Sequence, residues 1–584
     1  MKILFIYIPK NKRCVLKNVH SEVYDQSDHM MTLFRKNNLY LIISLIFLAA
    51  CSGSKSKFSK KDIRSSQRLI GLEFDKKYID TLSPYLEKNR EGFDSLRTYH
   101  LSNDVFPAVR FDPLPANFTP RQQSGFPDWG IPEGIELPEN TSQLAFYTIP
   151  ELASLIKNKK ISSLELTQFF IERLKKYNPI LQCTITITEE MALEQAKKMD
   201  KELATGNYRG ILHGIPYGVK DLMAVEGYKT TWGAEPYRNQ TIDVTATVVE
   251  KLQNAGGVLV AKLVSGSLAR GDVWFNGKTK NPWDTEQGAS GSSAGSGSAT
   301  SAGLVPFALG TETLGSITSP STRNGITGLR PTYGRVSRHG IMSWCWSMDK
   351  VGPMARSAED CAIVYSVITG KDPKDPTTID YPDGFEPKKD IKTLRIGYLK
   401  KDIEKDTSKS KVNLEKAITT FKNMGLTLNE VELPEDIPYN SFDIILRAEA
   451  GAFFDNLVRS GDVDLMVEQD QKSRANSLRQ ARFIPAVEYL QSNRHRQVLI
   501  EKMNGIMQEY DVLISPSFGN RQLIITNLTG HPVITIPTGL DEEKHPTSIT
   551  LVGNLYDEAS ILLLAKAFQK NTHYDEMHPE GYLD

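Results

Sequence analysis

The sequence predicts an α/β protein: a large mixed, mainly parallel β-sheet sandwiched between α-helices, with a helical N-terminal extension. Residues 162–165 form a helix capping box, a helical pattern follows until Pro179, and residues 183–187 then alternate like a strand. Residues 246–260 and 394–431 again place a helical pattern beside strand-like runs. Because the strands are separated by helices, we expect mostly parallel pairing with both sheet faces covered.

The chain is organised in three parts. Residues 1–51 are expected to be an upstream extension and a signal peptide, and residues 52–140 a tether and helical extension. Within the second part, a helical pattern gives way to a Pro-rich passage at 106–132, which predicts an irregular wrap. Residues 141–584 then form a single large domain, because no solenoid-type repeat divides them.

Composition limits the possible partners. The 584 residues include 70 basic and 70 acidic side chains, with 40% hydrophobic residues. Since the charges balance, no overall field attracts nucleic acid or anionic lipid. We therefore expect a small-molecule or peptide ligand and no nucleic acid.

The N-terminal region has the pattern of a targeting segment. Residues 35–36 are basic, the twelve residues 39–50 are mostly apolar, and small residues precede Cys51. Twelve residues are too few for a helix that spans a bilayer, which needs about 20. Leu-Ala-Ala-Cys resembles the bacterial lipobox, which implies an exported lipoprotein of the cell envelope, anchored in a membrane through lipid on Cys51. The start codon is then Met30 or Met31; a buried apolar helix is the alternative.

The other cysteines favour neither a metal site nor a redox motif. Cys14, Cys183, Cys345 and Cys361 show no C-x-x-C spacing, with Cys51 or with one another. If Cys51 carries lipid, at most one disulfide can form in the mature chain. We expect buried free thiols.

A run of small residues begins at Gly288 and reads G-A-S-G-S-S-A-G-S-G-S-A-T-S-A-G. This composition is typical of a flexible linker. However, it leads into the apolar run 304–309, so we expect it to be packed. It lacks the Lys of a Walker A loop and the third glycine of a dinucleotide fingerprint, and the chain has no G-x-S-x-G elbow.

No local motif in this chain pairs a serine with a histidine. A serine that acts as a nucleophile would therefore need another base to take its proton. Lysine can serve if burial lowers its pKa from about 10.4, because desolvation disfavours the ammonium form. Lys220 is the candidate, since it ends the apolar, glycine-punctuated segment 214–221. On this segment alone, a solvated surface lysine remains the alternative.

Four motifs in this order resemble the amidase signature family. They are G-I-P-Y-G-V-K-D from Gly214, G-S-S-A-G-S from Gly291, G-T-E-T-L-G-S-I from Gly310, and G-I-T-G-L-R-P-T-Y-G-R-V-S from Gly325. The resemblance covers about residues 141–568 and implies the family's fold and its Ser-cis-Ser-Lys triad. It implies no metal and no organic cofactor.

The resemblance assigns roles residue by residue. Lys220 falls on the family's base, Ser292 on the bridging serine in a cis peptide, and Ser316 on the nucleophile, 24 residues later. The backbone amides of four residues would form the oxyanion hole: Thr313, Leu314, Gly315 and Ser316.

Two neighbouring residues are possible supports. Ser293 could hydrogen-bond within the site, or pack. Asp221 could orient the lysine region, or cap a turn.

Two departures from the family pattern concern substrate shape. Leu314 stands where the family commonly has Gly or Asp, so its side chain must point away from the oxyanion or narrow the pocket. The family's G-G-S-S-G-G-S appears as S-G-S-S-A-G-S. Neither change removes a catalytic group.

The leading function is therefore an amidase that hydrolyses a carboxamide C–N bond through an acyl-serine intermediate. One alternative is the A subunit of a tRNA-dependent amidotransferase, whose motifs are equally similar. Another is a catalytically silent envelope binding protein. The amide substrate, the cleavage of esters or peptide amides, the oligomeric state and the membrane leaflet stay open.

Overall fold

The structure, a computed structural model, describes residues 58–98, 101, 105–115, 118–119, 123 and 125–583. The chain forms two compact units, residues 1–99 and 100–584. The predicted signal peptide, Cys14 and the lipobox Cys51 lie outside the described residues. Among the described residues, no helix combines the length and the apolar character needed to cross a membrane.

The first unit contains two helices, α2 (Lys60–Leu69) and α3 (Lys76–Leu96), which contact each other. Helix α2 starts with a capping box, in which Ser59 and Asp62 exchange hydrogen bonds between side chain and backbone. Ile63 and Ile79 are buried. This confirms the helical character predicted for the N-terminal extension.

In the described part of the chain, eleven strands of the second unit form one sheet in the order β1-β3-β2-β8-β10-β9-β14-β15-β13-β11-β12. Two short ribbons, β4–β5 and β6–β7, lie outside it. The strands are β1 (Thr184–Ile187), β2 (Pro216–Lys220), β3 (Val258–Leu263), β4 (Val273–Trp274), β5 (Gly277–Lys278), β6 (Lys280–Asn281), β7 (Asp284–Gly288), β8 (Phe307–Glu312), β9 (Thr327–Arg330), β10 (Lys350–Ala355), β11 (Ile396–Tyr398), β12 (Leu428–Glu430), β13 (Val512–Pro516), β14 (Val533–Leu540) and β15 (Pro546–Gly553).

The sheet is mixed, as predicted, but parallel pairing is the lesser part. Of the ten strand pairings in the sheet, four are parallel (β3–β2, β2–β8, β13–β11 and β11–β12) and six are antiparallel. The expectation of a mainly parallel sheet is therefore corrected. Short connections such as the one between β14 and β15 bring strands back antiparallel, whereas parallel neighbours need a long crossover.

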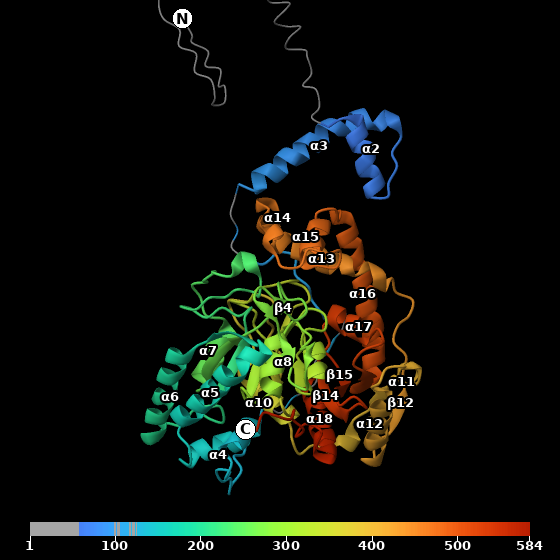
Figure 1. The fold of residues 1–584 in the computed structure, drawn as a ribbon. Coiled ribbons are helices and arrows are strands. Elements are labelled where there is room, and N and C mark those ends of the chain that lie inside the picture. Colours follow the sequence, from blue (N-terminus) through green and yellow to red (C-terminus); the bar gives the residue numbers. More distant parts are fainter. Residues whose placement is uncertain are drawn as a thin grey trace, which may run out of the picture. The chain divides into compact units, whose positions relative to one another are not determined.

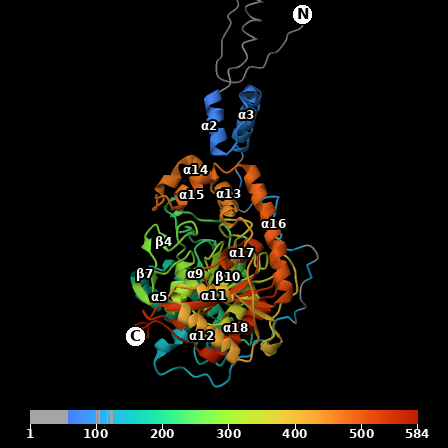
Figure 2. The same ribbon diagram turned by 90° about the vertical axis from the view of Figure 1, so that its right-hand side faces the viewer.

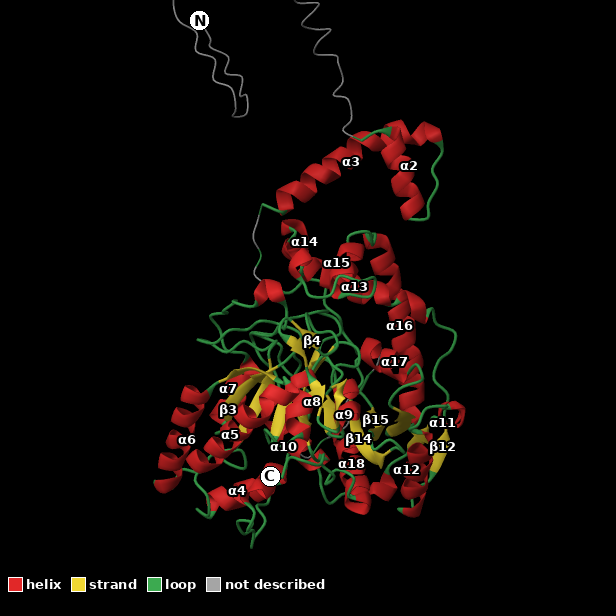
Figure 3. Ribbon diagram, in the orientation of Figure 1, coloured by secondary structure: helices red, strands yellow, loops and turns green. Residues whose placement is uncertain are grey.

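Helices cover the sheet of this unit on both faces, as Figure 3 shows. They are α4 (Ile149–Lys157), α5 (Ser163–Leu181), α6 (Glu189–Ala204), α7 (Thr247–Asn254), α8 (Ala294–Ser301), α9 (Thr318–Asn324), α10 (Ala358–Ile368), α11 (Lys400–Lys405), α12 (Lys411–Asn423), α13 (Asp443–Phe453), α14 (Asp455–Ser460), α15 (Arg474–Ala481), α16 (Ala486–Glu509), α17 (Gln522–Thr529) and α18 (Glu558–Thr572). The long α16 runs along one side of the unit and contacts α13 near one of its ends (Figures 1 and 2).

Strand residues alternate between two cores because successive side chains point to opposite faces. On β14, Ile534 and Ile536 join the core of one face, and Val533 joins the core of the other. On β3, Leu259 and Val260 are likewise divided between two cores. Because both faces of the sheet are buried, the central strands consist mainly of consecutive apolar residues.

The small-residue run is packed, as predicted. All eight residues of α8, Ala294–Ser301, are buried, and α8 contacts β8, β2 and β3. The strand expected at residues 304–309 begins three residues later, at Phe307. Cys183, Cys345 and Cys361 are buried free thiols, as expected.

Two boundaries differ from the sequence analysis. Helix α5 continues past Pro179 to Leu181 and closes at Gln182, whose φ is 48°. Pro179 removes one backbone donor from the last turn, and the buried side chain of Leu181 keeps that turn packed. The second unit begins at residue 100, so the predicted domain boundary at 140 falls inside it.

The Pro-rich wrap belongs to this unit because its residues form hydrogen bonds and ring contacts with residues of the unit that are distant in sequence. Arg110 donates to the carbonyl of Pro376 at 3.1 Å, and the Phe111 ring lies 5.0 Å from that of Tyr333. Ser154 donates to the carbonyl of Pro132 at 2.6 Å. The irregular wrap expected from the prolines is confirmed.

Arg173 on α5 provides a test of the packing. Its buried guanidinium donates to the carbonyls of Gly303 at 2.8 Å, Ala302 at 3.0 Å and Tyr582 at 2.8 Å. Arg173→Met should lower the free energy of unfolding by about 3 kcal/mol, since three carbonyls lose their donor. Urea unfolding checks this, with exposed Glu172→Gln as the control. Equal stability of the two variants would contradict the expectation.

Candidate active site

Lys220 is the last residue of β2, between β3 and β8. Its side chain is fully buried, and its Nζ donates to Ser292 Oγ at 2.7 Å and to Thr311 Oγ1 at 2.8 Å. Burial lowers the pKa of Lys220 well below its ordinary value, and the negative charges of Asp349 and Glu312 offset only part of this effect. The surface alternative for this lysine is thereby excluded.

The predicted bridging serine lies in the segment that enters α8. The peptide bond between Gly291 and Ser292 is cis, as the family resemblance implied, and Ser292 is fully buried. A side chain at Gly291 is impossible without rearrangement, because its Cβ would lie 1.8 Å from the carbonyl oxygen of Gly271. Glycine at this position therefore allows the close backbone approach that brings Ser292 to Lys220.

Ser316 lies in the loop between β8 and α9. The amide of Ser293 donates to the carbonyl of Ser316 at 3.2 Å, which joins this loop to the Ser292 segment. Ser316 is 8% exposed, and among the described residues its hydroxyl has no hydrogen-bond partner. The hydroxyl is thus free to meet a ligand at the surface.

The loop before Ser316 presents free amides. The N–H groups of Thr313, Leu314, Gly315 and Ser316 donate no hydrogen bond to any residue in the part of the chain that the structure describes. Gly315 has φ +87°, in the left-handed region that favours glycine. Leu314 is 40% exposed, so its side chain points to solvent, which is the first of the two alternatives given for it. Unpaired amides of this kind can stabilise a developing oxyanion.

Glu312 holds the C-terminal end of the same loop. Its Oε2 accepts from the amides of Ile317 and Thr318, both at 2.9 Å, and its Oε1 accepts from Arg330 at 2.5 Å and Asn527 at 2.9 Å. Burial alone would raise the pKa of Glu312, but the Arg330 charge and these donors lower it to about 2. Glu312 is therefore a paired structural carboxylate and not an acid catalyst.

Asp349 is a site residue that sequence reasoning missed. Its Oδ1 accepts from Thr313 Oγ1 at 2.5 Å, and its Oδ2 accepts from Ser343 Oγ at 3.1 Å and from the Trp344 amide at 2.6 Å. It therefore fixes the oxyanion loop to the segment 343–349. The available signal was an acidic residue placed directly before the buried strand β10.

The two possible supporting residues have different surroundings. Ser293 Oγ donates to the Thr311 carbonyl and accepts from the Thr311 amide, both at 3.2 Å, so it ties α8 to β8. Asp221 does not contact the Lys220 side chain. It pairs with buried Lys262 at 2.7 Å and accepts from Thr231, which fixes the turn after β2.

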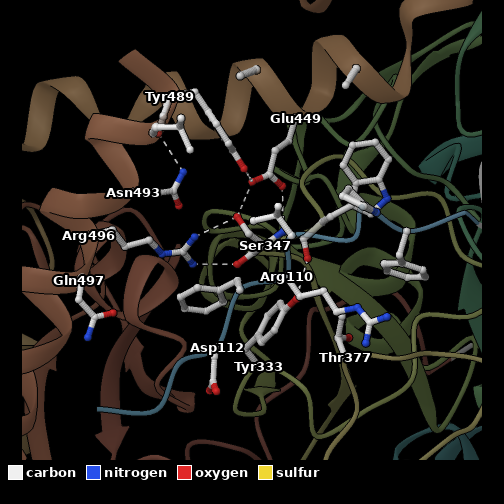
Figure 4. Close-up of a pocket in the computed structure, with 18 of the residues that line it drawn as sticks. Arg110, Asp112, Tyr333, Ser347, Thr377, Glu449, Tyr489, Asn493, Arg496 and Gln497 are labelled. Atoms are coloured by element: carbon white, nitrogen blue, oxygen red, sulfur yellow. Dashed lines mark hydrogen bonds between the residues drawn. The ribbon is translucent and has the colours of Figure 1, made fainter. Parts of the chain in front are cut away.

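Two cavities lie beside the segment 343–349. One, of about 650 Å³, is drawn in Figure 4 and is called the Glu449 cavity; Trp346, Glu449, Tyr489 and Arg496 are among its walls. Glu449 accepts from Ser347 and Tyr489, and Arg496 donates twice to Ser347. The other, of about 700 Å³, is called the Trp232 cavity.

Three aromatic residues near the predicted motifs have different surroundings. Tyr217 is core: its ring stacks on Phe307 at 5.4 Å. Trp344 is buried under the guanidinium of Arg474, 3.6 Å from its ring centroid. Trp346 lines both cavities.

Within the described residues, no cluster of three or more His, Cys, Asp or Glu side chains could hold a metal ion.

Comparison with known proteins agrees with this geometry. A family model described as Amidase matches residues 165–523. The chain is 32% identical over 487 residues to the glutamyl-tRNA(Gln) amidotransferase A subunit of Carboxydothermus hydrogenoformans, and the match covers 75% of this chain and 100% of the relative. A peptide amidase from Stenotrophomonas maltophilia has a similar structure, with a TM-score of 0.66 and 26% identity, covering 74% of this chain and 98% of that one.

The fold and these likenesses define an enzyme that acts on amide bonds. The chain belongs to the amidase signature family. The sequence-based assignment of family and fold is confirmed.

The pKa of Lys220 predicts a pH dependence. A fluorophosphonate should label Ser316 only while Lys220 is neutral, so labelling should fall as pH drops through the lowered pKa of Lys220. The pH range over which labelling falls, the acidic limb of the profile, should lie well below pH 10.4, the pKa of a solvated lysine. Mass spectrometry of labelled protein against pH measures it, and Lys220→Met should label slowly without the limb. A limb near pH 10 would show that Lys220 is not desolvated.

Glu312→Gln tests the loop support. The neutral amide leaves the fully buried Arg330 unpaired, so the free energy of unfolding should fall by about 3–5 kcal/mol. Because the folded-state pKa of Glu312 is lowered from 4.5 to about 2, this deficit should be complete above pH 4.5 and shrink as pH falls toward 2. Unfolding by urea across this range, with exposed Glu286→Gln as control, measures it. A deficit that does not change with pH would contradict the pairing.

Proposed function

We propose that this enzyme breaks a carboxamide C–N bond through a covalent acyl-Ser316 intermediate. The observation that carries the proposal is the fully buried Lys220 amine, 2.7 Å from Ser292 Oγ. A desolvated neutral amine can accept a proton near neutral pH, which is what a serine nucleophile needs from its base. Free amides lie in the same loop as the nucleophile.

In the acylation step, Ser316 Oγ attacks the amide carbon. Its proton passes to Ser292 Oγ, whose own proton passes to Lys220 Nζ. The carbonyl oxygen becomes an oxyanion and accepts hydrogen bonds from the amides of residues 313–316, an arrangement worth about 3 kcal/mol per donor. The relay then returns the proton to the departing nitrogen, and the C–N bond breaks.

In the deacylation step, a water molecule enters the site in place of the released amine. The relay through Ser292 takes a proton from water as its oxygen attacks the acyl carbon, and then returns a proton to Ser316 Oγ. A carboxylic acid is released and the enzyme is regenerated. Atoms balance with water as the only co-reactant.

A second candidate is the A subunit of a tRNA-dependent amidotransferase. The names of similar proteins favour it: the Carboxydothermus hydrogenoformans relative and an Acinetobacter baumannii protein, 33% identical over 484 residues, are both glutamyl-tRNA(Gln) amidotransferase A subunits. The same acyl-Ser316 step would then release ammonia for transfer within a complex. The stand-alone hydrolase is supported by the export pattern that ends at Cys51, because an exported protein would be separated from cytosolic tRNA.

We also propose export as a lipoprotein anchored through Cys51. This rests on the basic, apolar and small-residue pattern ending at Cys51, which lies outside the described residues. Mass spectrometry of the mature N-terminus should find diacylated or triacylated Cys51. An intact Met1 terminus would refute export and strengthen the amidotransferase candidate.

The catalytic proposal predicts the effect of three substitutions. Ser316→Ala, Ser292→Ala and Lys220→Ala should each lower kcat/KM by about three orders of magnitude or more, because each breaks the relay. Released amine or ammonia from a panel of amides is the readout. Ser296→Ala is the matched control, since this buried serine only donates to the Leu309 carbonyl.

Three outcomes separate the candidates. Full activity in Ser316→Ala would overturn the mechanism. Turnover by the purified chain alone supports the hydrolase. Ammonia release that requires added subunits and tRNA supports the amidotransferase.

A further inference from the structure

The first part of the Pro-rich wrap places two half-buried aromatic rings on polar side chains of the second unit. The guanidinium of Arg496, on α16, lies 3.4 Å from the centroid of the Phe111 ring. The ring of Tyr333 meets the same ring edge to face, with the centroids 5.0 Å apart. The guanidinium of Arg338 lies 5.4 Å from the centroid of the Phe106 ring. Both wrap rings precede the part of the chain that matches the family model.

Arg496 connects the Phe111 ring to the segment 343–349. The side chain of Arg496 is buried, and it donates to Ser347 Oγ at 2.9 Å and to the Ser347 carbonyl at 2.8 Å (Figure 4). It also donates to the carbonyl of Leu528 at 2.5 Å. A guanidinium that has lost its water gains from the face of an aromatic ring. The ring therefore stabilises the arginine in the position from which it holds Ser347.

Tyr333 and Arg338 hold neighbouring residues of the same segment. Tyr333 Oη donates to the Trp346 carbonyl at 2.8 Å. Arg338 donates to the same carbonyl at 2.6 Å and to the Asp349 carbonyl at 3.2 Å. The side chains that the two wrap rings cover therefore hold the segment at several carbonyls.

The segment 343–349 is in turn bonded to the oxyanion loop. The carboxylate of Asp349 accepts from Thr313 Oγ1 at 2.5 Å and from two amides of its own segment at 2.6 and 3.0 Å. Thr313 is the first of the four residues whose amides are unpaired in the described part of the chain. Contacts therefore connect Phe111 of the wrap to Thr313 of the oxyanion loop.

A later part of the wrap makes similar ring contacts at a different place. The Phe126 ring lies 5.9 Å from that of Tyr365, which donates to Asp383 at 2.8 Å. Trp129 stacks on Phe385 at 5.8 Å. Phe126 is therefore a matched comparison for Phe111: a half-buried ring of the same wrap, packed on a tyrosine, with other partners.

We propose that Phe111 is a positioning residue for the amidase reaction, because it braces the segment 343–349 and thereby holds the oxyanion loop in its reactive geometry. The inference rests on the proposed function and adds to it a residue from outside the family match. Phe111 acts through Arg496 and Tyr333 and not on the reacting atoms. Without the ring, water competes for the Arg496 donors, the segment loosens, and the amides that begin at Thr313 are placed less precisely.

The rate at which a fluorophosphonate labels Ser316 tests the brace, because the phosphoryl oxygen of the probe accepts from the same amides. Phe111→Ala should lower the maximal labelling rate about tenfold. The kcat for the best amide of the panel should fall by the same factor with KM unchanged, since these amides act mainly in the transition state. The acidic limb of labelling should stay at the same pH, because Lys220 is not disturbed.

Three further variants separate bracing from a general loss of packing. Phe111→Tyr keeps a ring over Arg496 and should restore the labelling rate of the unsubstituted protein. Phe111→Leu keeps an apolar side chain without a ring face, and it should lower the rate about threefold even if the alanine variant does not fold. Phe126→Leu is the control and should label normally. An unchanged rate in both Phe111→Ala and Phe111→Leu, or an equal loss in Phe126→Leu, would overturn the proposal.

A double-mutant cycle tests the route to the oxyanion loop. Thr313→Val removes the hydroxyl that donates to Asp349 and keeps the backbone amide. It should lower the labelling rate about tenfold by itself, and adding Phe111→Ala should then lower it less than about twofold, because the connection is already broken. Losses that multiply independently would show that Phe111 does not act through Asp349, and would refute the positioning role.

Hydrogen exchange measured by mass spectrometry follows the brace without catalysis. Two amides of the segment 343–349 donate to Asp349 and one donates to Glu449 at 2.9 Å, so the segment should exchange slowly. In Phe111→Ala, peptides that cover this segment should exchange about tenfold faster, whereas peptides that cover β2 should not change. Phe126→Leu should leave the exchange of both unchanged.

Failure of the brace can be told apart from failure of the proposed function. If the unsubstituted protein is not labelled at Ser316, both the proposed function and the positioning role are refuted. Normal labelling of that protein, with unchanged exchange of the segment 343–349 in Phe111→Ala, would refute the positioning role alone. Faster exchange of the segment with an unchanged labelling rate would also refute it, because the oxyanion loop would then be independent of the segment.

Discussion

The burial of one amine is the constraint on which the site depends. Lys220 Nζ must be removed from water to lose its charge, yet it must touch hydroxyl groups to exchange protons. A strand end between two parallel neighbours, covered by α8, meets both demands. Only small side chains in α8 and its approach allow backbone to come that close, as the Gly291–Gly271 contact shows.

Two carboxylates extend this arrangement to the oxyanion loop. Glu312 accepts hydrogen bonds from the amides that follow Ser316, and Asp349 accepts one from the hydroxyl of Thr313, which precedes Ser316. The amides between them are left without acceptors in the described protein. Both carboxylates are buried, and Glu312 is compensated by Arg330, so the loop is fixed by charge-assisted bonds that do not depend on the substrate. Preorganisation of this kind lets donors act without rearranging during the reaction.

The sequence allowed the family, the cis peptide before Ser292 and the layered α/β architecture to be predicted, because these depend on local order: glycine spacing, a capping box, and strands alternating with helices. It did not allow the proportion of antiparallel pairing to be predicted, since pairings such as β9–β14 join strands that are distant in sequence. Asp349 was missed for the same reason. Its partner Thr313 is 36 residues away, and a single aspartate carries no spacing signal.

The segment 343–349 connects the walls of two cavities to the oxyanion loop. Asp349 at its end accepts a hydrogen bond from Thr313, Ser347 bonds to Glu449 and Arg496, and Trp346 lines both cavities. A ligand that moves Trp346 must therefore act on a segment whose other contacts include the oxyanion loop, α13 and α16. Because packed segments of this kind shift as units and not atom by atom, substrate shape can influence the position of the amides that stabilise the transition state.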